Sequence, residues 1–154
     1  MTNPIPDDRP RVSAYLCVND AGAAVEFYTG VLGFTETRRM EFDGRVGHCE
    51  LALGDSLMML SDEWPEVGVV SPRTLGGTAT SMNVYVEDAD ATFDAAIAAG
   101  ATVIRPVEQQ LYGDRSGQFE DPWGHRWGVS THVEDVDDEE LARRAADMMS
   151  GDEH

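Results

Sequence analysis

The sequence contains no lysine, and all eleven of its basic residues are arginines. The absence of lysine excludes every reaction that begins with a Schiff base on a lysine amine. Against those arginines stand 29 acidic residues, which give a formal net charge of -18 at pH 7. Such a charge repels phosphate, so we expect no nucleic acid among the partners. Two interpretations stay open, a solvated acidic surface and a surface that attracts a cationic ligand.

Long apolar runs are also missing. No stretch approaches the roughly 20 apolar residues that a transmembrane helix needs, and residues 1–10 lack the apolar core of a signal peptide. The only two cysteines, Cys17 and Cys49, form no CxxC pair and lie in apolar strand patterns. We therefore expect a cytoplasmic protein with two free thiols and no membrane partner.

The sequence does contain a repeat. Residues 13–20 (SAYLCVND) and residues 81–88 (SMNVYVED) lie 68 positions apart, and each reads as a strand that leads into a helix. The distance is too long for a solenoid unit and too short for two independent domains. We therefore predict two half-domains that share one core, with any ligand at the seam between them.

Periodicity and turn residues predict the order βαβββ twice. In the first module the strands cover residues 12–18, 34–42, 46–53 and 56–61, and a helix capped by Asp20 covers residues 21–32. In the second module the strands cover residues 79–86, 102–106, 117–120 and 125–131, and a helix runs from Asp88 to Gly100. The loop 62–78 is expected to be a linker or a lid.

The predicted domain organisation follows from these elements. Residues 1–136 form a single domain, with module one at 11–62, a linker at 63–77 and module two at 78–133. Residues 137–154 form an acidic helix and tail, in which Asp137 and Glu140 have capping-box spacing. We expect Leu141 and Ala145 to lay an apolar stripe of this helix on the body of the protein.

The period of two in the strands separates an aliphatic face, which should carry the helix, from a mixed face. The mixed face resembles the wall of a binding cleft, apolar with a few placed polar groups. Its candidate ligand contacts are Ser13, Tyr15, Ser81, Asn83 and Tyr85.

On the third strand, His48 and Glu50 share one face two residues apart. They are either an acid/base or ligand-binding pair, and so the candidate catalytic residues, or a polar pair that orders the sheet.

Three further candidates lie in loops. Asp114 and Arg115 are bracketed by glycines, where Arg115 would either clamp a carboxylate or phosphate or form a salt bridge that fixes the loop. Trp64 lies in the linker, where its ring would stack on a ligand.

Two motifs carry a family resemblance: Phe27-Tyr-x-x-Val-Leu-Gly33 on the first helix, and Glu120-Asp-Pro-Trp-Gly-His125 before the last strand. With the paired βαβββ modules, they resemble the vicinal oxygen chelate superfamily, the group of glyoxalases, bleomycin-resistance proteins and extradiol dioxygenases. The segments 48–51, 112–117 and 131–135 resemble its PhnB-like subgroup. The resemblance implies an α+β fold in which tandem modules form a curved eight-stranded mixed sheet around a cleft, followed by a short C-terminal helix. It also implies a homodimer.

The resemblance also bears on metal binding. Enzymes of the superfamily hold a divalent metal on four strand positions, which would fall here on Ser13, Met59, Ser81 and Gly128. Serine, methionine and glycine are poor ligands for Ni, Zn, Fe or Mn, which need imidazole or carboxylate. We therefore expect no metal and no cofactor. The alternative is a divalent metal at a displaced site that uses His48 and Glu50.

The leading functional hypothesis is a metal-independent small-molecule-binding protein of the glyoxalase/bleomycin-resistance type. It would sequester a cationic or aromatic compound, in the manner of the antibiotic-resistance members. The alternative is a glyoxalase-like lyase or isomerase that uses the displaced metal, or His48 and Glu50 as acid and base.

Overall fold

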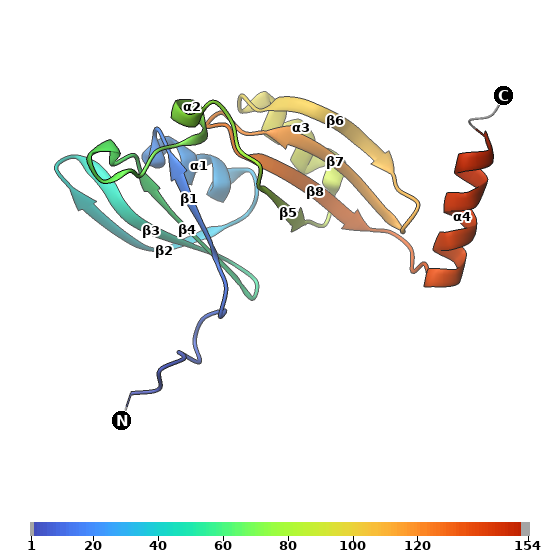
Figure 1. The fold of residues 1–154 in the computed structure, drawn as a ribbon, viewed down its shortest axis with the longest axis horizontal. Coiled ribbons are helices and arrows are strands. Elements are labelled where there is room, and N and C mark those ends of the chain that lie inside the picture. The colour runs from blue at the N-terminus through green and yellow to red at the C-terminus, as the bar shows by residue number, and fades with distance from the viewer. Residues whose placement is uncertain (1, 152–154) are drawn as a thin grey trace.

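The computed structural model describes residues 2–151 and shows the βαβββ order twice (Figure 1). Module one contains β1 (Ala14–Val18), α1 (Ala21–Gly30), β2 (Thr35–Phe42), β3 (Arg45–Leu53) and β4 (Ser56–Asp62). Module two contains β5 (Ser81–Tyr85), α3 (Ala89–Ala98), β6 (Thr102–Gln109), β7 (Asp114–Glu120) and β8 (Arg126–His132). None of the helices within residues 2–151 is long and apolar enough to cross a membrane.

Each module forms one mixed four-stranded sheet, with the orders β1-β4-β3-β2 and β5-β8-β7-β6. The first strand of each module pairs in parallel with the last, and the other pairs are antiparallel. The predicted α+β fold with eight strands is confirmed. The strands differ at their ends from the sequence prediction: β6 reaches Gln109 and β7 begins at Asp114, because these residues pair across the hairpin that the sequence suggested was a loop.

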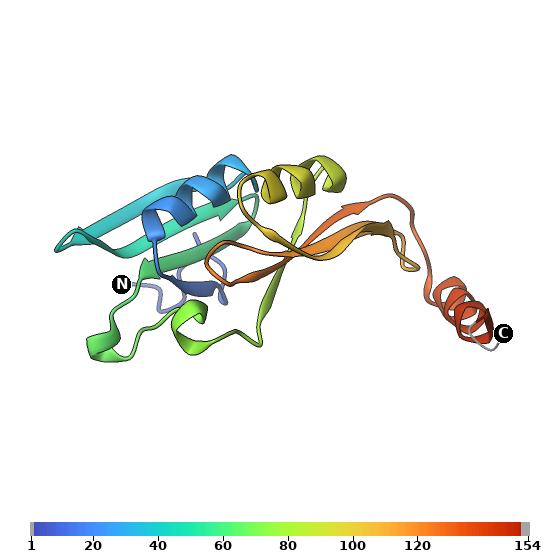
Figure 2. The ribbon, with the colours of Figure 1, turned by 90° about the horizontal axis from the view of Figure 1, so that it is seen from above.

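The two long helices begin where the sequence predicts. The Asp20 carboxylate accepts a hydrogen bond of 3.1 Å from the Ala23 amide, and Asp88 accepts one of 3.1 Å from Ala91. Each thereby satisfies an amide that the first turn leaves without a partner. The first helix ends earlier than predicted, at Gly30 rather than residue 32. Both helices lie on the same side of the two sheets (Figure 2).

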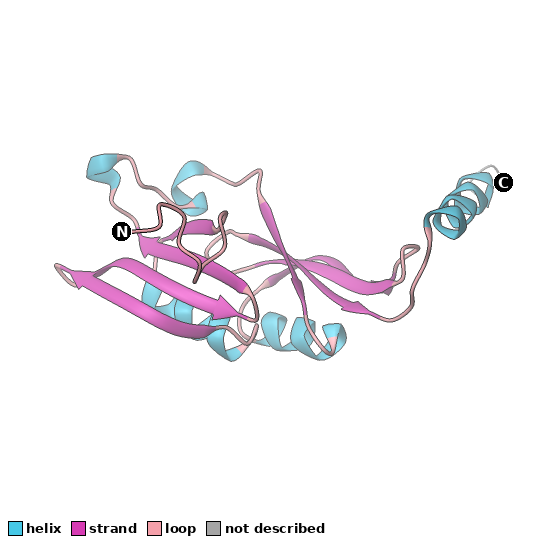
Figure 3. Ribbon diagram, turned by 90° about the horizontal axis from the view of Figure 1, so that it is seen from below, coloured by secondary structure: helices cyan, strands magenta, loops and turns pink. Residues whose placement is uncertain are grey.

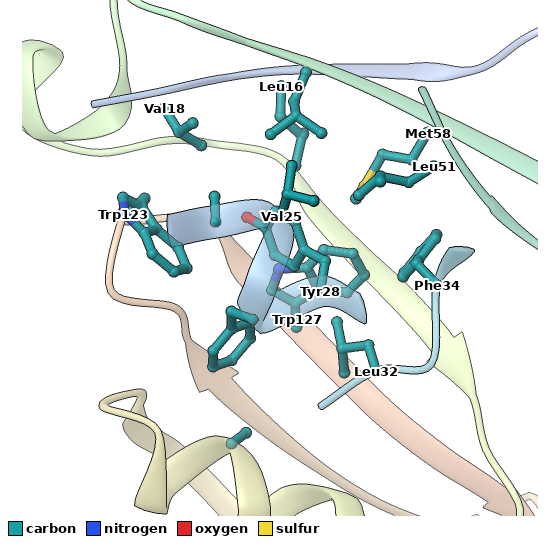
Figure 4. Close-up of a cluster of buried hydrophobic side chains, with 14 of the residues drawn as sticks. Leu16, Val18, Val25, Tyr28, Leu32, Phe34, Leu51, Met58, Trp123 and Trp127 are labelled. Carbon is teal, nitrogen blue, oxygen red and sulfur yellow. The ribbon is translucent and has the colours of Figure 1, made fainter. Parts of the chain in front are cut away.

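The core joins the two modules through aromatic side chains (Figure 4). Tyr28 of α1 and Trp127 of β8 are 0% and 2% exposed, and their ring centroids lie 5.4 Å apart. Burial of such side chains contributes about 1.5–3 kcal/mol each. The Tyr28 hydroxyl and the Trp127 indole N–H both donate to Oδ2 of the buried Asp121, so the polar groups of this core are paired.

The linker contains two short helices, η1 (Pro65–Val67) and α2 (Pro72–Leu75), where the sequence suggested a loop. Glu63 orders the linker, because its Oε1 atom accepts a hydrogen bond of 2.8 Å from the amide of the fully buried Ser71. Arg73 then donates to the carbonyl of Pro122 in module two at 3.1 Å. On the other side, Arg45 of β3 pairs with Glu66 at 2.9 Å, so the segment is tied to both modules and is a packed linker.

The last helix, α4 (Asp138–Gly151), begins at the predicted cap, where Asp137 accepts a hydrogen bond from the Glu140 amide at 2.8 Å. The helix stands away from the two sheets at one end of the molecule (Figure 1), and no residue on it is fully buried. Leu141 and Ala145, the predicted apolar stripe, are partly buried. Polar contacts of Arg144 join the helix to module two.

Candidate functional site

The sheet face opposite the helices carries the candidate site. On β1, Leu16 and Val18 are buried beneath α1, whereas Tyr15 points the other way and is 50% exposed. The alternation predicted for this strand therefore holds. The N-terminal segment lies on the side of the first sheet away from α1 (Figure 3).

Three predicted residues meet on this open face in one hydrogen-bonded chain. The Tyr15 hydroxyl lies 2.8 Å from Nδ1 of His48, and Nε2 of His48 lies 3.1 Å from Oε1 of Glu50. An ionised carboxylate can only accept, so Nε2 of His48 donates to Glu50, and Nδ1 shares the second hydrogen bond with the Tyr15 hydroxyl. The sequence placed His48 and Glu50 together, and the structure adds Tyr15 to them.

The ionisation of this chain follows from its contacts. The hydrogen bond from His48 holds the pKa of Glu50 below its usual range. Burial would raise this pKa, whereas the charges of Arg9 and Arg38 lower it further. Burial raises the pKa of Tyr15, which keeps its hydroxyl protonated. The arrangement is a protonated phenol and an imidazole that lead to an ionised carboxylate, and Glu50 is only 6% exposed.

Module two carries a second cluster of the same residue types. The Tyr85 hydroxyl donates to Oδ2 of Asp114 at 2.6 Å, and Nδ1 of His132 lies 2.9 Å from Oδ1 of Asp114. On the other side of the ring, Nε2 of His132 lies 2.7 Å from Asp135. Burial alone would raise the pKa of Asp114, but the hydrogen bonds from Tyr85 and His132 outweigh it and hold that pKa low.

Asp135 and Asp114 together raise the pKa of His132, because both ring nitrogens face carboxylates. Sequence reasoning left His132 outside the candidate site. The spacing of His132 and Asp135, three residues apart at the end of a strand, was the available signal.

The other predicted residues lie apart from the two clusters. Arg115 forms a bidentate ion pair with Asp90 of α3, at 2.6 and 2.9 Å. Of the two predicted alternatives for Arg115, a ligand clamp and a salt bridge, the structure shows the salt bridge. Trp64 lies beneath the guanidinium of Arg45, which is 3.7 Å from the centre of the ring. Its aromatic face is therefore already occupied on one side by a cation.

The three remaining candidates, Ser13, Ser81 and Asn83, come from the first strands of the modules. Ser13 lies just before β1, and Ser81 lines a small pocket of about 80 Å³ together with Gln118 and Arg126. Asn83 accepts a hydrogen bond of 3.4 Å from Ser130. These three residues belong to neither cluster.

A model of the Glyoxalase/Bleomycin resistance protein/Dioxygenase superfamily matches residues 11–129. The chain belongs to this superfamily. An uncharacterized protein of Mycobacterium tuberculosis strain H37Rv is 37% identical to it over 147 residues, covering 93% of this chain and 85% of the relative. A Mycobacterium bovis protein, also uncharacterized, is 37% identical, covering 93% of this chain and 95% of its own length.

Several solved structures share the fold. Protein PA1353 from Pseudomonas aeruginosa superposes with a TM-score of 0.67 at 22% identity, covering 81% of this chain and 99% of that protein. TioX from Micromonospora sp. ML1 has a TM-score of 0.60 at 26% identity, with coverages of 80% and 99%. A glyoxalase-related enzyme from Fulvimarina pelagi has a TM-score of 0.63 at 19% identity, with coverages of 79% and 87%.

The four residues to which the resemblance assigns the metal positions do not fit a divalent ion. Ser13, Met59, Ser81 and Gly128 offer no imidazole or carboxylate. A Cβ atom at Gly128 would lie 2.6 Å from Oδ1 of Asn83, so the amide takes the space that a ligand side chain on β8 would need. Within residues 2–151, no three His, Cys, Asp or Glu side chains are grouped to hold a metal.

Proposed function

We propose that this member of the superfamily is a metal-independent small-molecule-binding protein, which takes its ligand on the open face at Tyr15, His48 and Glu50. The observation that carries the proposal is the ionised, nearly buried Glu50 carboxylate, which His48 joins by hydrogen bonds to the half-exposed Tyr15. A buried carboxylate attracts a cationic group, and an exposed aromatic ring stacks on an aromatic one. The ligand is therefore a cationic or aromatic compound that the protein sequesters, as an antibiotic-resistance protein would.

Two wider features support a cationic ligand. The net charge of -18 raises the local concentration of cations around the molecule. On the open face of module two, Tyr85 is 60% exposed and its hydroxyl is fixed by the buried Asp114, which repeats the pairing of an aromatic ring with a carboxylate. Sequestration needs shape, stacking and charge, and these features supply the charge and an aromatic ring for stacking.

A second candidate function is favoured by one observation, the continuous chain from Tyr15 through His48 to Glu50. A proton that Tyr15 gives up or receives can be balanced by a shift across the imidazole, which makes His48 and Glu50 an acid/base pair. The protein would then be a glyoxalase-like lyase or isomerase, and the Fulvimarina pelagi protein that shares its fold is a glyoxalase-related enzyme. A displaced divalent metal on His48 and Glu50 is the other form of this alternative.

The proposal includes a homodimer of the PhnB-like kind, in which a second copy covers the open faces. The exposed Tyr15, Tyr85 and Tyr112 leave aromatic surface there that a partner could bury. Light scattering on a sizing column tests this part, and a monomer at micromolar concentration would contradict it.

A cytoplasmic location is also proposed, because burial raises the pKa of the free thiols Cys17 and Cys49 to about 11 and disfavours their oxidation.

The experiment for the binding function has two parts. The protein is purified without chelator and its Ni, Zn, Mn and Fe are quantified, and stoichiometric metal that disappears in His48→Ala or Glu50→Ala would overturn metal independence. The metal-free protein is then screened by thermal shift against cationic and aromatic antibiotics, with Glu50→Gln as the matched variant. We expect ligands that raise Tm in the native protein and lose that effect in Glu50→Gln.

A further inference from the structure

Glu50 receives its cationic partner from outside the sheet. Nη1 of Arg9, in the segment that precedes β1, lies 3.4 Å from Oε1 of Glu50, and the two residues are 41 positions apart. Strong pairs between a guanidinium and a carboxylate are shorter, at about 2.7–2.9 Å. The Arg9 side chain is 36% exposed, whereas that of Glu50 is 8% exposed, so the carboxylate is fixed in the sheet and its partner reaches in from solvent.

A cavity of about 630 Å³ lies where Arg9 reaches the sheet. Its lining residues come from the N-terminal segment on one side and from β2, β3, the turn before β4 and the start of β4 on the other. Figure 3 shows the N-terminal segment in front of this face of the first sheet. Its charged lining consists of four carboxylates and two guanidiniums: Asp7, Asp8, Glu50, Asp55, Arg9 and Arg38. The cavity is large enough for a small organic ligand.

We infer that Arg9 occupies the place of the ligand's cation, and that the cavity takes a guanidinium, amidinium or amine which displaces Arg9 from Glu50. The N-terminal segment is then a built-in competitor for the site. This inference rests on the proposed binding function, and it names the chemical class of the ligand and the part of the chain that regulates its entry.

The charges of the cavity favour a cation over an anion. An anion beside Glu50 would face a carboxylate that is almost fully buried and ionised, and like charges at such a site repel strongly. Once Arg9 has moved away, Arg38 is the one remaining guanidinium in the described lining, against four carboxylates. A ligand cation therefore restores the charge balance that Arg9 provides in the free protein.

The pair between Arg9 and Glu50 is also weak enough to be displaced. A long, half-exposed ion pair contributes little because water screens it and the arginine side chain loses freedom in forming it. Arg9 is joined to Glu50 by this contact alone among the hydrogen bonds and ion pairs of residues 2–151. A bound ligand would also contact the apolar side chains of Ala52 and Leu57, which line the same cavity.

The test uses benzamidinium, an aromatic amidinium, as the probe in calorimetric titrations of the full chain. Arg9→Ala and Arg9→Gln remove the competitor, and Arg11→Ala is the matched control, because Arg11 is exposed and makes no ion pair within the described part of the chain. We expect both Arg9 variants to bind benzamidinium about fivefold more tightly than the native protein, the strength of a half-exposed ion pair. Arg11→Ala should match the native protein.

Charge-matched probes complete the experiment. Benzoate and benzyl alcohol should gain nothing from Arg9→Ala, and NMR shifts of the His48 ring should locate the bound benzamidinium at Glu50. Unchanged or weaker binding of benzamidinium in the Arg9 variants, or benzoate binding that needs Arg9, would overturn the inference. The proposed function would still stand if compounds from the thermal-shift screen perturb His48 in the same variants, and it would fall with the inference if none does.

Discussion

The hydroxyl of Tyr28 on α1 donates a hydrogen bond of 2.5 Å to Oδ2 of Asp121, in the turn before β8. The two residues come from different modules, are 93 positions apart, and are both almost fully buried. The same carboxylate accepts from the amides of Trp123 and His125 through its other oxygen, at 3.0 and 2.9 Å. One acidic side chain therefore orders the turn of module two and fastens it to the helix of module one.

Replacing Tyr28 with phenylalanine should destabilise the protein. The ring and its packing stay, and Oδ2 of Asp121 keeps the Trp127 donor but loses the Tyr28 one, which as a typical hydrogen bond contributes about 0.5–1.5 kcal/mol. Urea unfolding measures the loss. Tyr112→Phe is the control, because Tyr112 is half-exposed and its hydroxyl makes only a long contact of 3.4 Å with Ser116. Equal free energies of unfolding for the two variants would show that the bond to Asp121 contributes nothing.

His132 should titrate above the ordinary histidine pKa of about 6.5. Asp135 and Asp114 stabilise the charged ring, so the folded-state pKa is raised above the unfolded one. The resulting stabilisation is fully present below the unfolded pKa and is lost as pH rises through the folded pKa. An NMR titration of the His132 ring measures the midpoint. Asp135→Asn should lower it, whereas Asp138→Asn, on an exposed residue of α4, should leave it in place. A midpoint that both variants leave alone would contradict this account.

Replacing Gly113 should lower the free energy of unfolding by more than the strain of its backbone angle alone would. Gly113 has φ +97, a left-handed conformation, and a Cβ atom there would collide with the carbonyl oxygen of Glu134. Gly76 has nearly the same angle, φ +94, with nothing within 4 Å, so it is the matched control. Gly76→Ala should cost about 1–2 kcal/mol from backbone strain, and Gly113→Ala about 1–3 kcal/mol more. If the two variants lose similar free energies of unfolding, the segment around Glu134 moves aside from the new Cβ atom without destabilising the protein.

The sequence predicted those features that depend on neighbouring residues. Asp20 and Asp88 begin helices because a short carboxylate reaches an amide three residues on, and Tyr15 and Leu16 face opposite ways because strands alternate. The shared face of His48 and Glu50 follows from the same alternation. Such local rules also located both modules of the repeat.

The features that the sequence did not predict depend on distant contacts. No periodicity connects Arg9 to Glu50, because residues 2–10 belong to no helix or strand, and their place is set by the sheet that they cross. His132 lies at the end of β8, where alternation no longer says which groups its two nitrogens will meet. Likewise, the amphipathic pattern of α4 predicted its apolar stripe, but it did not predict that Arg144 would donate to the distant Leu111 carbonyl.

Arg144 should be the residue that attaches α4 to module two. Its guanidinium donates to the carbonyl of Leu111 at 3.1 Å and to Oε1 of Glu134 at 2.6 Å, while its pairing with Glu140 stays within the helix. Arg143 is the matched control, because its partners Glu140 and Asp147 are both on α4.

The Arg144→Ala and Arg143→Ala variants each lose one arginine and one pairing with Glu140, so the helix itself is weakened to a similar degree. Only Arg144→Ala also releases the helix from the Leu111 carbonyl and from Glu134. A protease that cleaves after acidic residues should therefore cut within residues 134–140 several times faster in Arg144→Ala than in Arg143→Ala, since cleavage follows local opening. Equal cleavage rates would show that the contacts of Val133 and Glu134 with the Gly113 carbonyl hold the segment by themselves.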